Sequence, residues 1–244
     1  MKATPYEFRA RFWILVAIFA LGFVAPWDYW LHLDGTGPNT HVWGRLAIEL
    51  SRAGVNISVA FNLILAFGIA CAFAGAALRT WASACLGPDV VRGGDLHGEQ
   101  MVVTGPYRYV RNPLYLGSWL NALALALLMP PTGAVLTLVL VVAFELRLVL
   151  AEEAYLAANL GQTYADYRAR VPQLLPAWRP RVAAAGTSPR WGMAALAEIF
   201  LWGTAVSFAA VGWQYNAHLL IQCVLVSLGL SLVVRGVSMQ PQTA

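Results

Sequence analysis

Long apolar runs dominate the chain and set its predicted elements. They lie at Phe12–Leu31, Ile57–Leu78, Pro113–Met129, Ala134–Leu150, Met193–Trp213 and Leu219–Val234. A helix crosses the hydrocarbon core with about 20 apolar residues, within a range of about 17 to 25, so the shorter runs rely on snorkelling side chains or local thinning. No alternation of apolar and polar residues is long enough for a barrel strand, and helices are the remaining way to satisfy backbone groups in lipid. The pattern predicts an all-α, polytopic transmembrane helical bundle with about six spans.

The basic residues are distributed unevenly around these runs. If all six cross the bilayer from a cytoplasmic N-terminus, 14 of the 16 Lys and Arg residues face the cytoplasm, and only Arg45 and Arg52 face the other side. The positive-inside rule therefore predicts cytoplasmic termini. The first run ends in Trp27, Tyr29 and Trp30 rather than in a small-x-small cleavage site, which favours a retained span. A chain that is 59% hydrophobic and 11% charged is not a soluble domain, and we expect membrane lipids rather than nucleic acid around it.

The only long polar stretches are residues 79–112 and 151–190, and both fall on the predicted cytoplasmic side. Pro130-Pro131 leaves almost no loop between the third and fourth runs, which predicts a tight antiparallel hairpin. We expect three parts: N-terminal helices over 1–78, a core with the hairpin and a cytoplasmic site over 79–180, and C-terminal helices over 181–244. The three cysteines lack metal-ligand spacing, so no metal site is predicted. The roles of loop 34–56 and of the last two runs, and the oligomeric state, are left open.

The first polar stretch leads into the sequence GPYRYVRNPLYLG, residues 105–117. Asn112-Pro113 has the pattern of a helix start, with Asn at the N-cap and Pro at the first helical position. The free N–H groups of such a start attract anions, and Arg108 and Arg111 add two positive charges beside it. The alternative is that both Arg side chains only anchor the helix to lipid headgroups, which does not require the interleaved tyrosines.

A carboxylate lies inside the fourth run. An ionisable residue such as Glu145 is costly among apolar residues in lipid and indicates a functional site. If the helix continues past the membrane, Glu145 and Glu152 lie on one face, seven residues apart. The alternative is a structural pair of Glu145 with Arg147 or with an Arg of the other polar stretch.

Two further carboxylates follow the fourth run, at Glu152 and Glu153. Adjacent helical residues point about 100° apart, so both cannot face one ligand equally. We expect Glu152 to face the protein with Glu145, and Glu153 to face the loop, where Arg108 or Arg168 would pair with it. A solvated helix face is the alternative for both carboxylates.

The order of these motifs is informative: GPYRYVRNPLYLG, a hairpin, a Glu-Glu pair and then GxxYxxYxxxVPxxLP. Over Leu78 to Pro180 it resembles the isoprenylcysteine carboxyl methyltransferases and phospholipid N-methyltransferases. The resemblance implies an integral membrane enzyme that binds S-adenosyl-L-methionine on its cytoplasmic side. It assigns cofactor binding to Tyr107, Arg108, Tyr109, Val110, Arg111, Asn112, Pro113, Tyr115, Gly117, Glu152 and Glu153. Many relatives have His at the position of Asn112, so a role that needs an imidazole cannot be carried over.

The chemistry of S-adenosylmethionine agrees with these residue types. Arg binds a carboxylate in a bidentate way, Glu can hold the ammonium or the ribose hydroxyls, and a Tyr face favours a sulfonium. We take Arg111, Glu145 and Glu152 as candidate catalytic residues. Alignment supplies much of the rate of an in-line methyl transfer. A carboxylate acceptor needs no base, whereas an amine must lose a proton that Glu145 or Glu152 would accept.

The acceptor is expected to be a lipophilic small molecule or a lipid that enters from the bilayer. A prenylcysteine-type carboxylate leads, a phospholipid ethanolamine amine is second, and a thiol is third. Because some sterol reductases resemble the same core, an NADPH-dependent membrane reductase is an alternative enzyme. A non-enzymatic lipid-binding or transport protein is the other alternative, but polar residues along the runs are few: Asn62, Asn121, Glu145 and Glu198.

Overall fold

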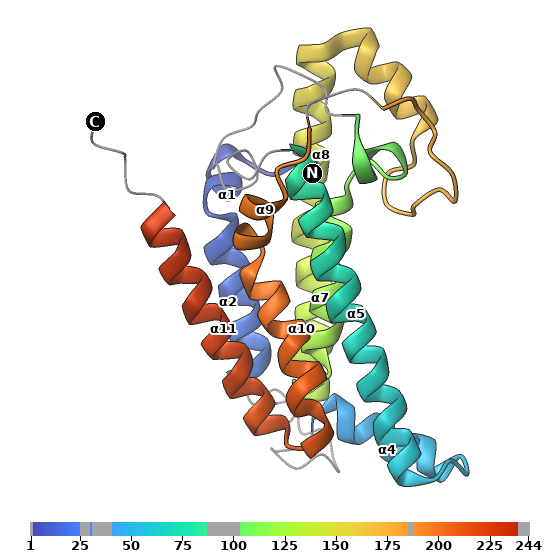
Figure 1. Cartoon of the computed structure of the whole chain (residues 1–244), viewed down its shortest axis with the longest axis vertical. Coiled ribbons are helices and arrows are strands. Elements are labelled where there is room, and N and C mark those ends of the chain that lie inside the picture. The colour runs from blue at the N-terminus through green and yellow to red at the C-terminus, as the bar shows by residue number, and fades with distance from the viewer. Residues whose placement is uncertain (1, 25–29, 31–40, 87–102, 185–187, 239–244) are drawn as a thin grey trace. The chain divides into compact units, whose positions relative to one another are not determined.

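The computed structural model describes residues 2–24, 30, 41–86, 103–184 and 188–238. Its elements, of which Figure 1 labels the α-helices, are α1 (Pro5–Arg9), α2 (Arg11–Val24), α4 (Val42–Arg52), α5 (Ile57–Leu86), η1 (Gly105–Arg108), α7 (Pro113–Ala126), α8 (Pro131–Arg170), α9 (Trp191–Ala197), α10 (Ile199–Val211), η2 (Gly212–Gln214) and α11 (Ala217–Ser238). Each of these elements is helical, which confirms the predicted all-α class for the described residues.

Three helices, α5, α8 and α11, are long and apolar enough to cross a membrane. A fourth candidate results if α9 and α10, which are bent by 71° at their junction, count as one span. The chain is therefore an integral membrane protein with several candidate membrane helices. The remaining predicted runs contain α2 and α7, each of 14 residues. At 1.5 Å per residue such a helix covers roughly 21 Å of a hydrocarbon core of about 30 Å.

The six spans and the cytoplasmic termini thus stay predictions. The aromatic residues Trp27 and Tyr29, which end the first run, lie outside the described residues.

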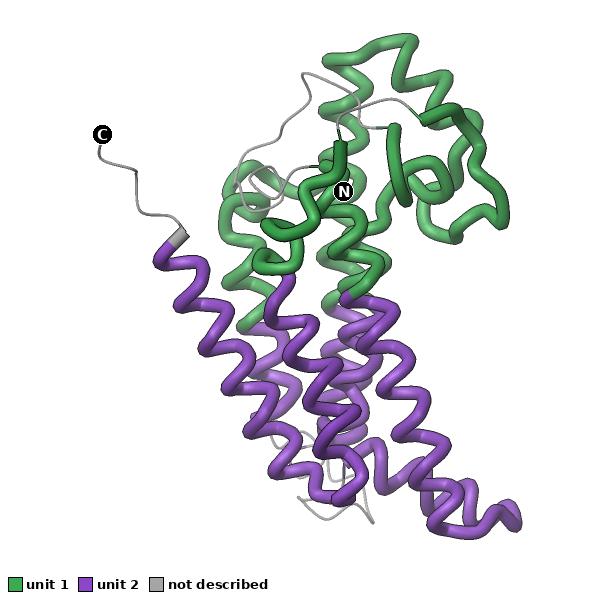
Figure 2. Tube along the Cα trace, viewed as in Figure 1, with its two compact units in different colours: residues 1–16, 77–119, 141–197 green, residues 17–76, 120–140, 198–244 purple. Residues whose placement is uncertain are grey.

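The chain divides into two compact units, coloured separately in Figure 2. Unit 1 holds residues 1–16, 77–119 and 141–197, and unit 2 holds residues 17–76, 120–140 and 198–244. The long helices α5 and α8 each contribute residues to both units. The division at residues 78 and 180 expected from the sequence stays a prediction.

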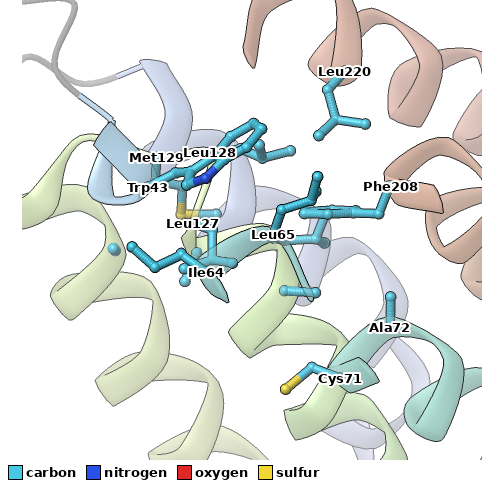
Figure 3. Packing of buried hydrophobic residues seen from close by; sticks show 14 of the residues in the cluster. Trp43, Ile64, Leu65, Cys71, Ala72, Leu127, Leu128, Met129, Phe208 and Leu220 are labelled. Carbon is cyan, nitrogen blue, oxygen red and sulfur yellow. The ribbon is translucent and has the colours of Figure 1, made fainter. Parts of the chain in front are cut away.

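Unit 2 is built around one apolar cluster (Figure 3). Trp43 of α4, Leu65 of α5 and Phe208 of α10 are among its most buried members, at 2%, 1% and 1% exposure. Close helix contact is supported by glycine, because a Cβ on Gly133 would collide with the backbone of Gly22. The core of this unit therefore depends on the fit of apolar side chains and on small residues where backbones approach.

The turn between α7 and α8 is as tight as Pro130-Pro131 predicts. α7 ends at Ala126 and α8 begins at Pro131. The carbonyls of Leu127 and Met129 in this turn accept hydrogen bonds from the backbone N–H groups of Trp43 and Val42, at 2.9 Å each. The start of α4 thus satisfies carbonyls that the end of α7 leaves without a helical partner.

Helix α4 itself was not predicted, because the sequence interpretation treated 34–56 as a loop. Trp43 and Ala47, four residues apart, form its buried face, while Glu49 and Arg52 form an exposed ion pair at 2.9 Å. The amphipathic spacing was present in the sequence, but the segment is too short and too polar to register as an apolar run.

Helix α8 continues well past the apolar run, as the argument about Glu145 and Glu152 requires. Its 40 residues include one non-helical position, Gly161, with φ 52° and ψ −125°. Beyond this break Tyr164 and Tyr167, three residues apart, lie on one face and are buried at 2% and 7% exposure. They pack with Val103 and Val171 in a small apolar cluster of unit 1.

Candidate active site

The loop before α7 is fixed in unit 1 by backbone contacts with the segment that follows α8. The carbonyl of Tyr109 accepts from the N–H of Ala177, and the N–H of Arg111 donates to the carbonyl of Pro172, both at 2.9 Å. Gly105 has φ 57°, and a Cβ there would meet the side chains of Cys85 and Trp81, so glycine is required on both counts. The two predicted polar stretches therefore meet in one structure.

Helix α7 begins at Pro113, as predicted. The carbonyl of Asn112 accepts from the N–H of Leu116 at 3.2 Å, which is the first turn of the helix. The side-chain amide of Asn112 points to other partners, since its Nδ2 donates to Oε1 of Glu153 at 3.0 Å and to the carbonyl of Gln173 at 3.2 Å. Asn112 is buried at 7% exposure, so both bonds form away from solvent.

Arg111 completes this cluster. Its Nη1 lies 3.3 Å from Oε2 of Glu153, and the two side chains are only 10% and 7% exposed. One carboxylate thus holds both the amide of Asn112 and the guanidinium of Arg111. A buried carboxylate with two donors is strongly fixed, because neither side can leave without stranding a charge. The expectation that Glu153 pairs with Arg108 or Arg168 is wrong, since the geometry of α8 directs it to Arg111.

The neighbouring carboxylate, Glu152, is partly buried and has different surroundings. It lies within electrostatic reach of the hydroxyls of Tyr107 and Tyr115 and of the guanidinium of Arg11. The charge of Glu145 also acts on the hydroxyl of Tyr115. Glu145 and Glu152 therefore face the same side of α8, as predicted.

Tyr107 is buried at 8% exposure, and its hydroxyl makes no hydrogen bond to any described residue. Burial, reinforced by the charge of Glu152, raises the pKa of Tyr107 well above its usual range. The phenol is therefore neutral and can donate a hydrogen bond. Its backbone carbonyl accepts from the hydroxyl of Tyr167 at 2.8 Å, which holds the residue in place.

A second buried carboxylate site surrounds Glu145, which is 2% exposed. Arg79, Ser118 and Trp119 are its polar neighbours. Arg79 is held by a bond of 2.6 Å from its Nη1 to Oγ of Ser118. Of the two structural pairings considered from sequence, Arg147 pairs with Glu7 instead, and Arg79, an Arg of the other polar stretch, is the basic residue whose charge acts on Glu145.

The other predicted residues occupy structural positions around this centre. Nε of Arg108 donates to the carbonyl of Val182 at 3.0 Å, and the ring of Tyr109 lies 6.2 Å from that of Trp81. Val110, Pro113 and Gly117 are buried. Arg108 therefore fastens the loop to the segment after α8, and its predicted role at an anion stays a prediction.

Sequence reasoning missed the contribution of the N-terminus. Arg147 pairs with Glu7 of α1, with Nη2 at 2.7 Å and 2.8 Å from the two carboxylate oxygens. Thr4 and Glu7 form a capping box, with the Thr4 side chain accepting from the N–H of Glu7. The Thr-x-x-Glu spacing with Pro5 at the first helical position was a readable helix start.

Comparison with known proteins bears on these residues directly. Residues 63–163 match the family described as phospholipid methyltransferase. This central segment is similar to that family of membrane methyltransferases. Members of the phospholipid methyltransferase family use S-adenosyl-L-methionine. The matched segment contains the Tyr107–Gly117 loop and the three glutamates of α8.

A 77-residue stretch is also 36% identical to protein-S-isoprenylcysteine O-methyltransferase of Schizosaccharomyces pombe. It covers 31% of this chain and 33% of that relative, so the chain matches about a third of the relative's length. No solved structure matches the chain.

Proposed function

We propose that the chain is an S-adenosylmethionine-dependent membrane methyltransferase whose acceptor is lipophilic, with a prenylcysteine-type carboxylate as the leading acceptor. The observation that carries the proposal is the arrangement of the Tyr107–Gly117 loop around Glu153 and Glu152 in the segment that matches the methyltransferase family.

The residues of this site fit the cofactor. The hydroxyl of Tyr107 and Nε of Arg111 are buried polar atoms without a partner among the described residues. Buried polar atoms in native proteins are nearly always paired, so two orphaned donors, one near Glu152 and one on the partner of Glu153, suit a polar ligand. When bound, S-adenosylmethionine supplies a methyl group on a sulfonium that needs no further activation.

Each residue then has a distinct part in binding. Arg111 and Tyr107 offer donors to the carboxylate or hydroxyl groups of the cofactor, and Glu152 offers an acceptor to its ammonium or ribose. Glu153 is too firmly held by Arg111 and Asn112 to be the main ligand contact. It fixes the loop in the binding geometry, which matters because orientation alone can contribute roughly 7–11 kcal/mol to a transfer reaction.

The chemical nature of the acceptor determines whether the site needs a base. A carboxylate attacks the methyl carbon directly, the carbon–sulfur bond breaks, and no proton moves. An ethanolamine amine must also lose a proton, for which Glu145, buried beside Arg79, is the candidate base. The identity over 77 residues with an isoprenylcysteine enzyme supports the carboxylate first, with the amine and then a thiol as the other acceptors.

The proposal includes six spans with both termini and the active site on the cytoplasmic side. It rests on the split of 14 basic residues against two. In a variant without Cys71, Cys85 and Cys223, single cysteines at positions 40 and 188 are labelled by a membrane-impermeant reagent in sealed vesicles. We expect the two positions to label from opposite sides, and labelling from the same side contradicts six spans.

The function is tested with the full chain purified in detergent. Isothermal titration with S-adenosylmethionine and, in parallel, with NADPH separates methyl transfer from reduction. Labelled methyl transfer is then measured to N-acetyl-S-farnesylcysteine, to its methyl ester as a blocked control, to phosphatidylethanolamine and to an alkyl thiol. We expect cofactor binding and transfer to the free acid alone. Binding of NADPH only would overturn the proposal, and transfer to the lipid amine would reassign the acceptor.

A further inference from the structure

The N-terminal segment of the chain is part of unit 1, together with residues 77–119 and 141–197 (Figure 2). It lies wholly outside the 63–163 segment that matches the methyltransferase family. Any part that it has in the site is therefore an addition to the family core.

Helix α1 is fixed to α8 by side-chain and backbone contacts. Glu7 binds Arg147 through both carboxylate oxygens at 2.7 Å and 2.8 Å, and the N–H of Ala3 donates to the carbonyl of Arg147 at 3.1 Å. Phe8, the next residue, is buried at 3% exposure. Two strong polar bonds and a buried ring together define one docked position for α1.

The docked helix determines where Arg11 lies. Its guanidinium carbon lies 4.4 Å from the centre of the Phe8 ring, a cation–π distance. Arg11 is also the basic residue whose charge acts on Glu152 and on the hydroxyl of Tyr115. Because the ring of Phe8 is itself buried, the position of the guanidinium follows from the docking of α1.

The paired carboxylates of α8 thus have separate basic neighbours. Glu153 has Arg111, which comes from the family loop, and Glu152 has Arg11, which comes from the N-terminus. Two adjacent carboxylates repel each other, and each is held only if a positive charge compensates it. Among the described groups that act on Glu152, Arg11 supplies a positive charge and Tyr115 a hydrogen bond, so loss of Arg11 removes that compensating charge.

We propose that Arg11 is a positioning residue for Glu152, and that the Glu7–Arg147 pair sets its place by docking α1 on α8. This inference rests on the proposed function, since Glu152 is taken to contact the cofactor. Arg11 acts through Glu152: it fixes the direction and the charge of the carboxylate that receives the ammonium or ribose of S-adenosylmethionine.

The test uses three variants of the full chain in detergent: Arg11→Ala, Arg11→Lys and, as a matched control, Arg9→Ala. Arg9 ends α1, two residues before Arg11 at the start of α2, carries the same charge and is exposed. For Arg11→Ala we expect the dissociation constant for S-adenosylmethionine to rise about tenfold or more. Arg11→Lys retains the charge and should recover most of the affinity, and Arg9→Ala should bind as the wild type does.

A double-mutant cycle tests the docking pair. Glu7→Gln and Arg147→Gln should each weaken cofactor binding, and the double variant should be no weaker than the worse single variant, because both changes break one interaction. Thermal unfolding of each variant is measured beside the affinity. Loss of affinity in Arg11→Ala without a matching fall in melting temperature supports positioning.

Two results would overturn the inference. One is wild-type affinity in Arg11→Ala. The other is a loss that Lys does not recover and that parallels a lower melting temperature, which makes the contact merely structural. Failure of the proposed function looks different, because the wild type itself would then bind no S-adenosylmethionine.

Discussion

The buried polar groups of the two units differ in how they find their hydrogen-bond partners. Among the described residues, unit 1 buries the amide and carboxylate side chains of Asn112, Glu145 and Glu153 beside the hydroxyls of Thr80 and Ser83, and Glu153 bonds to Asn112 and Arg111 from a distant segment. In unit 2 buried hydroxyls bond to their own helix, as Thr204 does to the carbonyl of Phe200 at 3.0 Å and Ser207 to that of Gly203 at 2.7 Å. Unit 2 also buries Asn121 and Glu198, and its apolar interior is the cluster around Trp43, Leu65 and Phe208.

This difference indicates a division of labour. A buried hydroxyl that bonds to its own helix meets its hydrogen-bonding requirement locally. It therefore does little to determine which segments of the chain pack together. A buried carboxylate that bonds to another segment costs free energy unless all its partners are in place, so it is retained where it fixes a particular arrangement. Ligand binding should therefore depend on charge in unit 1, while unit 2 should respond to shape.

The largest expected effect comes from Glu153→Ala. It strands the 10%-exposed Arg111 and removes a partner of Asn112, and breaking a buried pair in this way costs about 3–5 kcal/mol. We expect a marked fall in the free energy of unfolding in detergent, with loss of S-adenosylmethionine binding. The control is Glu49→Ala, whose pair with Arg52 is exposed on both sides and is worth about 1 kcal/mol or less. An equal fall in the free energy of unfolding for both variants would contradict the difference between the buried and the exposed ion pair.

The corresponding change in unit 2 is Gly133→Ala, which adds one methyl group against the backbone of Gly22. Overpacking typically costs about 1–3 kcal/mol, and backbone can give way less easily than a side chain. The free energy of unfolding should fall while the cofactor affinity of the folded protein stays unchanged. Gly44→Ala in α4, where a Cβ meets nothing within 4 Å, is the control and should be neutral or stabilising. A selective loss of cofactor affinity in Gly133→Ala would contradict the division of labour.

Asn112→Asp tests the direction of the hydrogen bond to Glu153. The substitution keeps the size but replaces the Nδ2 donor with a second carboxylate 3.0 Å from the first. Losing a buried bond to a charged group costs about 1.5–3 kcal/mol, and we expect tenfold or greater loss of S-adenosylmethionine affinity in titration. Asn112→His restores an N–H donor and should bind more tightly than the Asp variant. The reverse order would mean that the amide oxygen, rather than the nitrogen, is the important atom.

The smallest expected effect is that of Tyr107→Phe. Its hydroxyl has no partner among the described residues. Removal of the hydroxyl should therefore leave the free energy of unfolding of the ligand-free protein nearly unchanged. If that hydroxyl donates to the cofactor, affinity falls by about 0.5–1.5 kcal/mol, the value of one neutral hydrogen bond. Tyr167→Phe loses a bond of 2.8 Å to the carbonyl of Tyr107 and should instead lower stability first. Unchanged affinity in Tyr107→Phe would remove its hydroxyl from the site.

Features that local sequence determines were predictable. Asn112-Pro113 specifies where α7 begins, and Pro130-Pro131 specifies a short turn, because proline acts on its immediate neighbours. The placement of Glu145 and Glu152 on one face depended on α8 continuing past its apolar run, and the helix does so. The residues assigned to the candidate site through family resemblance lie together in unit 1 for the same reason: the motif is contiguous, apart from the Glu-Glu pair.

Long-range pairing was not predictable from one sequence. Glu7 and Arg147 are 140 residues apart, and no local pattern connects them. The helix period shows that Glu152 and Glu153 face differently, but only packing decides that Glu153 is the one that meets Arg111. The number of spans stays a prediction for another reason: apolar content indicates a helix, but the helix length, 14 residues in α2 and in α7, depends on where the chain turns.

The contact between α4 and the turn after α7 has a consequence for the order in which the protein is made. The N–H groups of Val42 and Trp43 bond to the carbonyls of Met129 and Leu127, and synthesis delivers the donors long before the acceptors. A growing chain folds from its N-terminal side, so α4 emerges with its first amides open to solvent. They become protected only when the third and fourth apolar runs have been inserted, and a nascent chain arrested before residue 127 would exchange these two amides rapidly. The step that closes α4 therefore waits for α7, and the last part of unit 2, residues 198–244, follows it in synthesis.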